Sequence, residues 1–199
     1  MVQLSYGGPF FEVFFAFDLY ENAGAVRFIL SQGKPVVNIL HVLSGDFVTG
    51  SETSTAALIE QQVKAGHQVL IAAGSFSQPT KARLVPVPIY DRGFFQRLFN
   101  TGSLVKIIRR EKIDIVHAHS RAASWVCHWA CRLTKTAYLS TLHGRQHLHL
   151  SNRRHNVYGP RVIAVCENIR EQMLKETSVF EPEQLVVIRN GLNLTTGRE

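Results

Sequence analysis

Val36-Val37-Asn38-Ile39-Leu40-His41-Val42-Leu43 is an almost continuous apolar run, and it ends at the turn signal Ser44-Gly45-Asp46. An apolar run of this length is typical of a strand that is buried on both faces of a parallel sheet. The next residues, Thr49-Gly50-Ser51-Glu52, fit a capping box, with Thr at the cap and Glu three positions later. Strand, turn and helix in this order predict the opening of a βαβ unit.

Short apolar strands and helical segments continue to alternate along the rest of the chain. Pro86 and Pro88 lack a backbone N–H, so the strand that contains them is expected at the edge of the sheet. This alternation predicts an α/β fold, a Rossmann-like three-layer sandwich around a mostly parallel sheet. The later strands are expected at 68–73, 82–89, 114–119, 136–142, 161–165 and 184–188. The helices are expected at 50–65, 93–112 with a possible break at Gly102, 121–133 and 167–175.

The charge of the chain is strongly uneven. The net charge is +7, and residues 81–161 hold 15 Lys and Arg against three acidic residues. A basic surface of this kind attracts phosphate groups, whether in anionic lipid, nucleic acid or a nucleotide-linked metabolite. No nucleic-acid-binding motif accompanies the charge, so nucleic acid is not expected as a partner.

Cysteine content argues against a disulfide-stabilised protein, and hydropathy argues against a membrane-spanning one. The three cysteines, Cys127, Cys131 and Cys166, do not form a disulfide framework, which favours a reducing, cytoplasmic compartment. No uninterrupted apolar stretch reaches the roughly 18 residues that a spanning helix needs. Residues 1–34 are treated as an apolar N-terminal extension that is rich in Phe. This segment has three alternative interpretations, which are an apolar flap on the domain, a contact with a membrane surface, and sequence upstream of the true start.

Glycine and polar residues stand where the expected strands end. The carboxyl ends of parallel strands share one edge of a sheet, and ligands bind at that edge. The helix that follows Gly50 offers free N–H groups and the positive end of its dipole, which suits a diphosphate. A tight βα turn without a ligand is an equally good interpretation of that segment taken alone.

Histidines gather in the second half of the chain. His117 and His119 alternate along one strand and therefore share a face. His143 leaves the next strand beside Gly144, where an imidazole can hydrogen-bond a ligand near pH 7. There is no HExxH motif and no carboxylate nearby in sequence, so we predict structural or substrate-contacting histidines and no metal site. A metal would need further ligands from His143, His147, His149 and His155.

Six segments in this order resemble the N-terminal domain of GT-B glycosyltransferases, in particular family 4, the retaining enzymes that act on nucleotide-sugars. The resemblance covers roughly residues 36–195. It departs from the family pattern at Ser51, where a second Gly is usual, at Cys166, where Ser is frequent, and at Arg189, where Pro is frequent. The segments are 37–43 with Gly50-Ser51-Glu52, 64–69, 112–120, 141–144, 162–170 and 187–191.

The resemblance also implies a role for each matching residue. Gly50, Ser51 and Glu52 would face the donor diphosphate, and His143 would be the catalytic residue that stabilises charge at the transferred sugar. Neither a metal nor another cofactor is implied. The acceptor side would hold His119, Ser120, Arg121, Gly144 and Arg145, and the hinge would hold Asn190 and Gly191.

The resemblance implies a domain organisation and a function. Residues 35–192 would form a Rossmann-like glycosyltransferase N-terminal domain, and 193–199 would begin the linker to a second, donor-binding domain that is absent. We expect the acceptor-side half of a hexosyltransferase that is inactive alone and moves a sugar from a nucleotide-sugar to a glycan or lipid-linked acceptor, as in lipopolysaccharide or cell-envelope synthesis. It would be cytoplasmic, with possible peripheral contact to the anionic inner face of the membrane. The alternative is a non-catalytic Rossmann-like module that pairs with a separate donor-binding chain.

Overall fold

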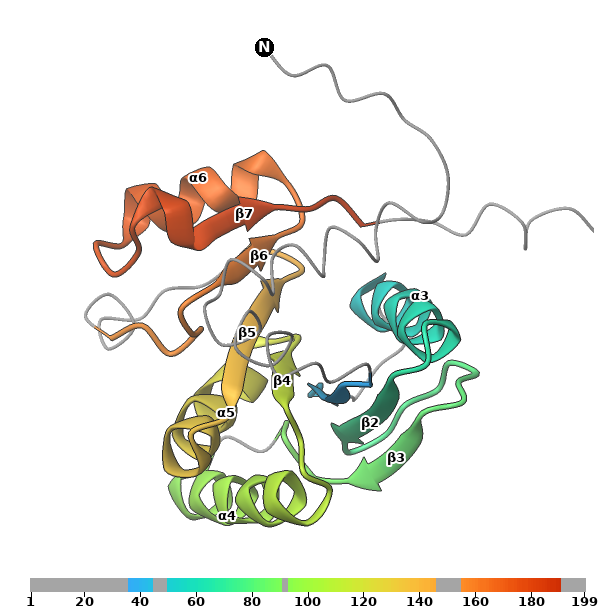
Figure 1. The fold of residues 1–199 in the computed structure, drawn as a ribbon. Coiled ribbons are helices and arrows are strands. Elements are labelled where there is room, and N and C mark those ends of the chain that lie inside the picture. The colour runs from blue at the N-terminus through green and yellow to red at the C-terminus, as the bar shows by residue number, and fades with distance from the viewer. Residues whose placement is uncertain (1–35, 45–49, 91–92, 146–154, 191–199) are drawn as a thin grey trace, which may run out of the picture. The chain divides into compact units, whose positions relative to one another are not determined.

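A computed structural model of the chain describes residues 36–44, 50–90, 93–145 and 155–190. The expected N-terminal extension, the capping Thr49, the hinge Gly191, the linker 193–199, His147 and His149 lie outside the described residues. The elements follow one another as β1 (Asn38–Val42), α3 (Gly50–Lys64), β2 (Gln68–Ala73), β3 (Arg83–Pro86), α4 (Phe94–Arg110), β4 (Ile115–Ala118), α5 (Arg121–Thr134), β5 (Ala137–Leu142), β6 (Val162–Ala164), α6 (Glu167–Glu176), the 3-10 helix η2 (Pro182–Gln184) and β7 (Leu185–Val187) (Figure 1).

The seven described strands form one sheet in the order β3-β2-β1-β4-β5-β6-β7, and every neighbouring pair is parallel (Figure 1). This confirms the predicted α/β, Rossmann-like architecture. The expected edge position of the proline-containing strand is also correct, because β3 pairs only with β2 and ends at Pro86. Pro86 has no N–H to give to a further strand.

The elements form where the sequence predicts them, with two differences. Strand β3, at Arg83–Pro86, is half as long as the predicted strand 82–89, whereas Gly66, at φ 88°, follows α3 as expected of a helix stop. The break at Gly102 predicted for the helix 93–112 does not occur, since α4 runs unbroken from Phe94 to Arg110. A single Gly in a helix costs only about 1 kcal/mol relative to Ala. Packing of Leu104 and Ile108 against the sheet holds α4 together across it.

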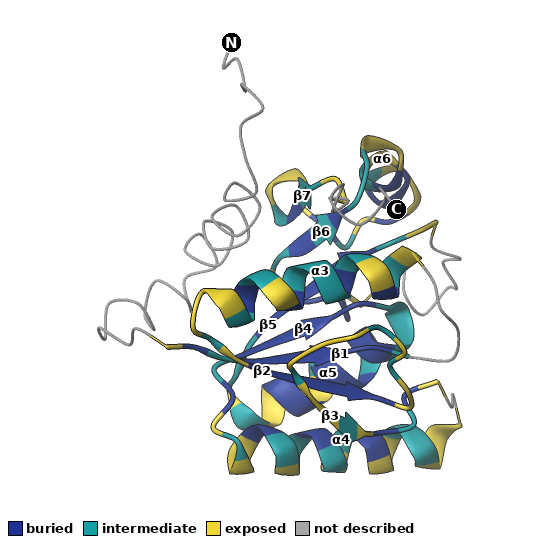
Figure 2. Cartoon of the chain, turned by 90° about the vertical axis from the view of Figure 1, so that its right-hand side faces the viewer, coloured by how far each residue is buried: buried dark blue, intermediate teal, exposed yellow. Residues whose placement is uncertain are grey.

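Helices cover both faces of the sheet, which makes three layers (Figure 2). Helix α3 covers one face, where Ile59 packs against Leu43, just after β1, and against apolar residues of β2. Helices α4 and α5 cover the other face and bury the larger apolar core with alternate residues of the same strands. Helix α6 packs on β6 and β7 around Met173. Among the helices of the described ranges, none combines the length and apolar character needed to cross a membrane.

Candidate functional site

The strand order changes direction between β1 and β4 at the carboxyl edge of the sheet. β2 lies on one side of β1 and β4 lies on the other. The helix after β1, α3, covers one face of the sheet, whereas the helix after β4, α5, covers the opposite face. In open parallel sheets the reversal of strand order marks the ligand-binding crevice. A ligand-binding crevice is therefore expected beside Gly50 and the segment His119–Arg121.

Helix α3 begins at Gly50, which is exposed. A Cβ built on Gly50 would meet no atom within 4 Å. The N–H groups at the start of this 15-residue helix and its dipole suit an anionic group.

Glu52, predicted to close a capping box and to face the donor, is bound to another loop. It is 5% exposed, and its carboxylate accepts hydrogen bonds from the Ser77 backbone N–H at 2.7 Å and the Ser77 hydroxyl at 3.0 Å. The described hydrogen bonds of Glu52 thus hold the loop after β2 against α3. Its contact with a donor stays a prediction.

Four histidines from three adjacent strand ends form one group under α3, the histidine cluster (His41, His117, His119 and His143). His41 Nδ1 lies 2.7 Å from His119 Nε2, and His119 Nδ1 lies 3.2 Å from His143 Nε2. The rings of His117 and His119 are tilted by 34° to each other, with centroids 4.1 Å apart. Strand alternation explains the grouping, because His41 and His117 are register partners on β1 and β4.

Helix α3 completes the polar contacts of the histidine cluster. Gln62 Oε1 lies 2.7 Å from His41 Nε2, and Thr55 Oγ1 lies 3.1 Å from His119 Nδ1. The Thr55 hydroxyl donates to the Ser51 carbonyl oxygen at 2.7 Å. A continuous line of contacts therefore runs from His143 to the first turn of α3. The structure brings the predicted donor turn and the predicted catalytic histidine to one edge of the sheet.

The histidine cluster is uncharged at neutral pH. Burial lowers the pKa of His41 and the pKa of His143 to about 4. Burial, together with the charge of neighbouring histidines, holds the pKa of His117 and the pKa of His119 well below the usual 6.5. Each ring therefore acts near pH 7 as a neutral hydrogen-bonding group rather than as a cation.

The geometry of the histidine cluster is that of a hydrogen-bond network. His41, His117 and His119 each have a ring nitrogen within 4.8 Å of the others, so they are the described residues that could hold a metal. Two imidazole ligands of tetrahedral zinc, each about 2.0–2.1 Å from the ion, stand well over 3 Å apart. The separation of 2.7 Å between His41 and His119 is that of a hydrogen bond.

The residues predicted for the acceptor side lie at the start of α5, in the histidine cluster and just after β5. Ser120 caps α5, because its hydroxyl accepts from the Ala123 N–H at 3.1 Å. Arg121 begins α5, and its charge lowers the pKa of Tyr158, which burial nevertheless raises to about 12. His119 is only 5% exposed, and its Nδ1 contacts His143 Nε2. Gly144 is exposed.

Arg145 opens onto a separate polar pocket beside α6. The pocket holds about 540 Å³ and has no aliphatic or aromatic side chain in its lining. The lining carries side chains of both charge signs and two amide groups, which can hydrogen-bond a ligand that has many hydroxyl groups. The lining residues are Arg145, Asn168, Glu171, Gln172, Lys175 and Glu176.

Sequence reasoning missed His41, Thr55 and Gln62. The signal for His41 was present, since Ile39, His41 and Leu43 alternate to the face that α3 covers. Thr55 and Gln62 stand seven apart, two turns along one face of α3. Asn190, predicted for the hinge, is exposed just after β7, and its partner Gly191 lies outside the described residues.

Comparisons with solved structures agree with this fold. The chain is similar to a glycosyltransferase from Rickettsia africae ESF-5, with 25% identity, a TM-score of 0.68, and coverage of 79% of this chain and 44% of that one. It is also similar to Anabaena Alr3699/HepE, solved with UDP and glucose (16% identity, TM-score 0.64, coverage of 78% and 45%). The lipopolysaccharide outer core galactosyltransferase WaaB is similar too (13% identity, TM-score 0.58, coverage of 80% and 47%). The chain spans less than half the length of these proteins.

The family comparison matches most of the described fold. The model of Glycosyltransferase Family 4 matches residues 48–196, a range that contains Gly50, the histidines His117, His119 and His143, and the segment around Asn190. None of the curated proteins compared with the chain matches it. The predicted resemblance is confirmed, and the chain belongs to Glycosyltransferase Family 4.

Proposed function

We propose that this chain is the acceptor-side lobe of a retaining glycosyltransferase. The enzyme would move a sugar, a hexose, from a nucleotide-sugar to a glycan or lipid-linked acceptor. The observation that carries the proposal is the line of contacts from His143 through His119 and Thr55 to Ser51. It joins an anion-binding helix start to a neutral imidazole at one crevice. A second, donor-binding lobe would close the crevice, and the chain alone would be inactive.

The donor diphosphate would lie at the first turn of α3. The first N–H groups of α3 would bind the phosphate, and the Ser51 hydroxyl would add a polar group there. His143, neutral because of its pKa of about 4, would hydrogen-bond the transferred sugar instead of donating a full positive charge. No metal or other cofactor takes part in this scheme. Asn190 and Gly191 would form the hinge to the second lobe.

The acceptor would lie toward α5 and α6. Ser120 and Arg121 stand at the start of α5, at the same carboxyl edge as His143. The polar pocket at Arg145 suits sugar hydroxyl groups. Arg145→Ala should therefore raise KM for the acceptor while leaving KM for the nucleotide-sugar unchanged. An equal change in both constants would remove the pocket from the proposal.

Titration of nucleotide-sugars tests the proposal as a whole. The chain would be joined to a donor-binding domain of the family and titrated calorimetrically, with UDP-sugars first because the Anabaena neighbour was solved with UDP and glucose. His143→Ala should then lower kcat about 10²- to 10³-fold, the range for the loss of one charge-stabilising group. Absence of nucleotide-sugar binding, or unchanged turnover in His143→Ala, would overturn it.

The alternative function is a non-catalytic module that pairs with a separate donor-binding chain. It shares the fold and the family with the first proposal. Transferase activity of the isolated 199 residues would exclude it. Co-elution with a donor-binding chain, with no turnover by the pair, would establish it instead.

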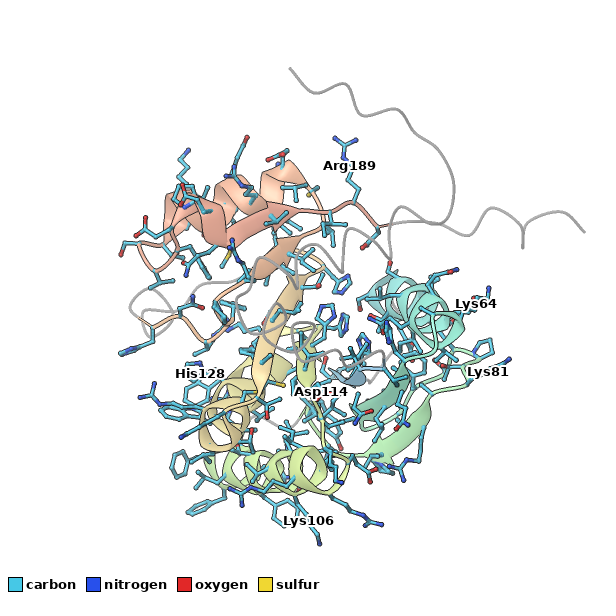
Figure 3. All side chains as sticks on the ribbon, viewed as in Figure 1. Lys64, Lys81, Lys106, Asp114, His128 and Arg189 are labelled. Atoms are coloured by element: carbon cyan, nitrogen blue, oxygen red, sulfur yellow. The ribbon has the colours of Figure 1, made fainter. Side chains whose placement is uncertain are left out.

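Contact with an anionic membrane would fit a lipid-linked acceptor, and α4 carries the surface for it. The α4 aromatic patch consists of Phe94, Phe95, Leu98 and Phe99, which are 70%, 83%, 56% and 69% exposed. Helix α4 contains no acidic residue and ends in Arg109 and Arg110. Figure 3 shows Lys106 on this helix pointing away from the sheet. Exposed aromatic residues beside basic ones are typical of surfaces that insert into the headgroup region of anionic bilayers.

Liposome co-sedimentation tests the membrane contact. Binding should rise with the content of anionic lipid and should drop at least tenfold in the variant Phe95→Ser with Phe99→Ser. Leu84→Ser is the matched control, since Leu84 is an exposed apolar residue on β3, outside the patch. Binding that ignores lipid charge, or that is equal in both variants, would contradict the proposal.

A further inference from the structure

The hydrogen bonds of the histidine cluster form a chain whose direction is coupled from end to end. The chain runs Gln62–His41–His119–His143, with separations of 2.7, 2.7 and 3.2 Å. A neutral imidazole has one N–H donor and one bare nitrogen acceptor. Fixing the proton on one ring therefore fixes the proton on each of the others.

Thr55 determines which ring nitrogen of His119 carries the proton. A hydroxyl has one hydrogen, and Thr55 donates it to the Ser51 carbonyl oxygen at 2.7 Å. Toward His119 Nδ1, 3.1 Å away, the Thr55 oxygen can then only accept. His119 must therefore carry its proton on Nδ1. Its bare Nε2 accepts from His41 Nδ1–H, which leaves His41 Nε2 bare.

Gln62, at the other end of this chain of hydrogen bonds, indicates the same proton positions. The oxygen and nitrogen of an amide are assigned from their hydrogen bonds and are interchangeable by a half-turn. With Oε1 toward His41, the buried Gln62 Nε2 has no partner within the described residues. A half-turn pairs this N–H donor with the bare His41 Nε2. It leaves a carbonyl unpaired instead, which is the less costly of the two.

His143 is the last ring in this chain of hydrogen bonds. Its Nε2 faces the protonated Nδ1 of His119 at 3.2 Å and must accept, so its own proton lies on Nδ1. His143 Nδ1 is shielded from water and has no hydrogen-bond partner within the ranges that the structure describes. We propose that Thr55, His119, His41 and Gln62 are positioning residues that hold His143 as the Nδ1-protonated tautomer, with a hydrogen-bond donor ready for an oxygen atom of the ligand.

This tautomer decides what His143 can do. A neutral ring with its proton on Nδ1 and with Nε2 occupied donates to a hydroxyl, carbonyl or phosphoryl oxygen, and it cannot remove a proton through Nδ1. His143 would orient the donor and stabilise charge on an oxygen rather than serve as a general base. Only the identity of that oxygen rests on the proposed function, because the tautomer is a property of this chain alone.

Nitrogen NMR tests the proposal without turnover. The full chain would be labelled with ¹⁵N-histidine, and long-range ¹H–¹⁵N correlations at pH 7 distinguish protonated from bare ring nitrogens. His→Gln variants of single residues assign the signals. We expect protonated Nδ1 and bare Nε2 at His41, His119 and His143. A bare Nδ1 at His143 overturns the proposal, whether or not nucleotide-sugars bind.

Two variants test whether the neighbours cause the tautomer. Thr55→Val removes the acceptor for His119, and Gln62→Met removes the donor to His41, so each should shift His143 toward a mixture of tautomers. Ser54→Ala is the matched control, because the exposed Ser54 hydroxyl bonds the Gly50 carbonyl oxygen on the same turn of α3 but does not touch a histidine. Unchanged His143 signals in both variants would overturn the positioning role.

Addition of zinc sulfate to the labelled chain separates the hydrogen-bond chain from a metal site. The proposal expects unchanged nitrogen signals at equimolar Zn²⁺. If His41 and His119 both lose their N–H signals on titration, the group is a metal site and the proposal fails. Where a variant does not fold, the tautomer and zinc measurements on the unsubstituted chain still decide the question.

Discussion

The two faces of the sheet are built from the same strands but are filled in opposite ways. On the face of α4 and α5, β1 and β4 contribute Leu40, Val42, Val116 and Ala118 to a large apolar core. On the face of α3, the alternate positions carry the histidine cluster. A buried polar group costs free energy unless it is hydrogen-bonded, and it adds little stability when it is. The first face therefore stabilises the fold, and the second is organised for a site.

The largest effect on stability is expected on the apolar face. Leu104→Ala in α4 removes a fully buried side chain from the core and should lower the free energy of unfolding by about 2–5 kcal/mol. Chemical denaturation at pH 7 measures this. Leu98→Ala, on the same helix but 56% exposed, should change it by less than about 0.5 kcal/mol. Equal losses in the two variants would remove the distinction between core and surface on α4.

A smaller effect is expected on the histidine face, and it depends on pH. The pKa of His41 is about 4 in the folded chain and 6.5 when unfolded, so between these values the unfolded chain binds more protons. Stability is therefore complete above pH 6.5 and falls as the pH drops toward 4. Each pKa unit is worth about 1.4 kcal/mol, so His41 accounts for a loss of roughly 2–3 kcal/mol by pH 4.5.

Comparison of pH slopes isolates this contribution from that of other groups. Denaturation at pH 7 and at pH 4.5 should show a smaller loss for His41→Gln than for the unsubstituted chain. His155→Gln, at an exposed position, should keep the full loss. An identical pH dependence in all three proteins would mean that the α3 face tolerates charge, and the contrast between the faces would fail.

The smallest effect on stability separates the site from the fold on the histidine face itself. Gly50→Ala should change the free energy of unfolding by less than about 0.5 kcal/mol, because the new Cβ meets no atom within 4 Å. It should still weaken nucleotide-sugar binding by the joined two-lobe protein, since the methyl group fills the space proposed for phosphate. Gly102→Ala on α4, which also meets no atom, should leave that affinity unchanged. Equal affinities in both variants would place the phosphate elsewhere.

The sequence was sufficient for the architecture because the architecture depends on local signals. Apolar runs between turn residues located the strands, and Pro86 placed β3 at the edge before any strand order was known. The alternation of His117 and His119 showed that they share a face. The break expected at Gly102 was wrong because core packing along α4 outweighs the weak helix propensity of one residue.

The contacts of the site could not be predicted because they join distant parts of the chain. His41 meets Gln62 across 21 residues and His119 across 78, and both contacts depend on where α3 lies over the sheet. The run around His41 was interpreted as simply apolar. Glu52 satisfied the capping-box pattern, yet its described hydrogen bonds go to Ser77, a partner on a loop that carried no signal of its own.

The bonds between Glu52 and Ser77 tie an outer loop to the start of α3. Ser77 is the partner through which the segment after β2 braces this helix, two residues beyond Gly50. Replacement of Ser77 would release the Glu52 carboxylate and loosen the helix that supplies Thr55 and Gln62 to the histidine cluster. An outer loop therefore constrains a buried network that it does not itself belong to.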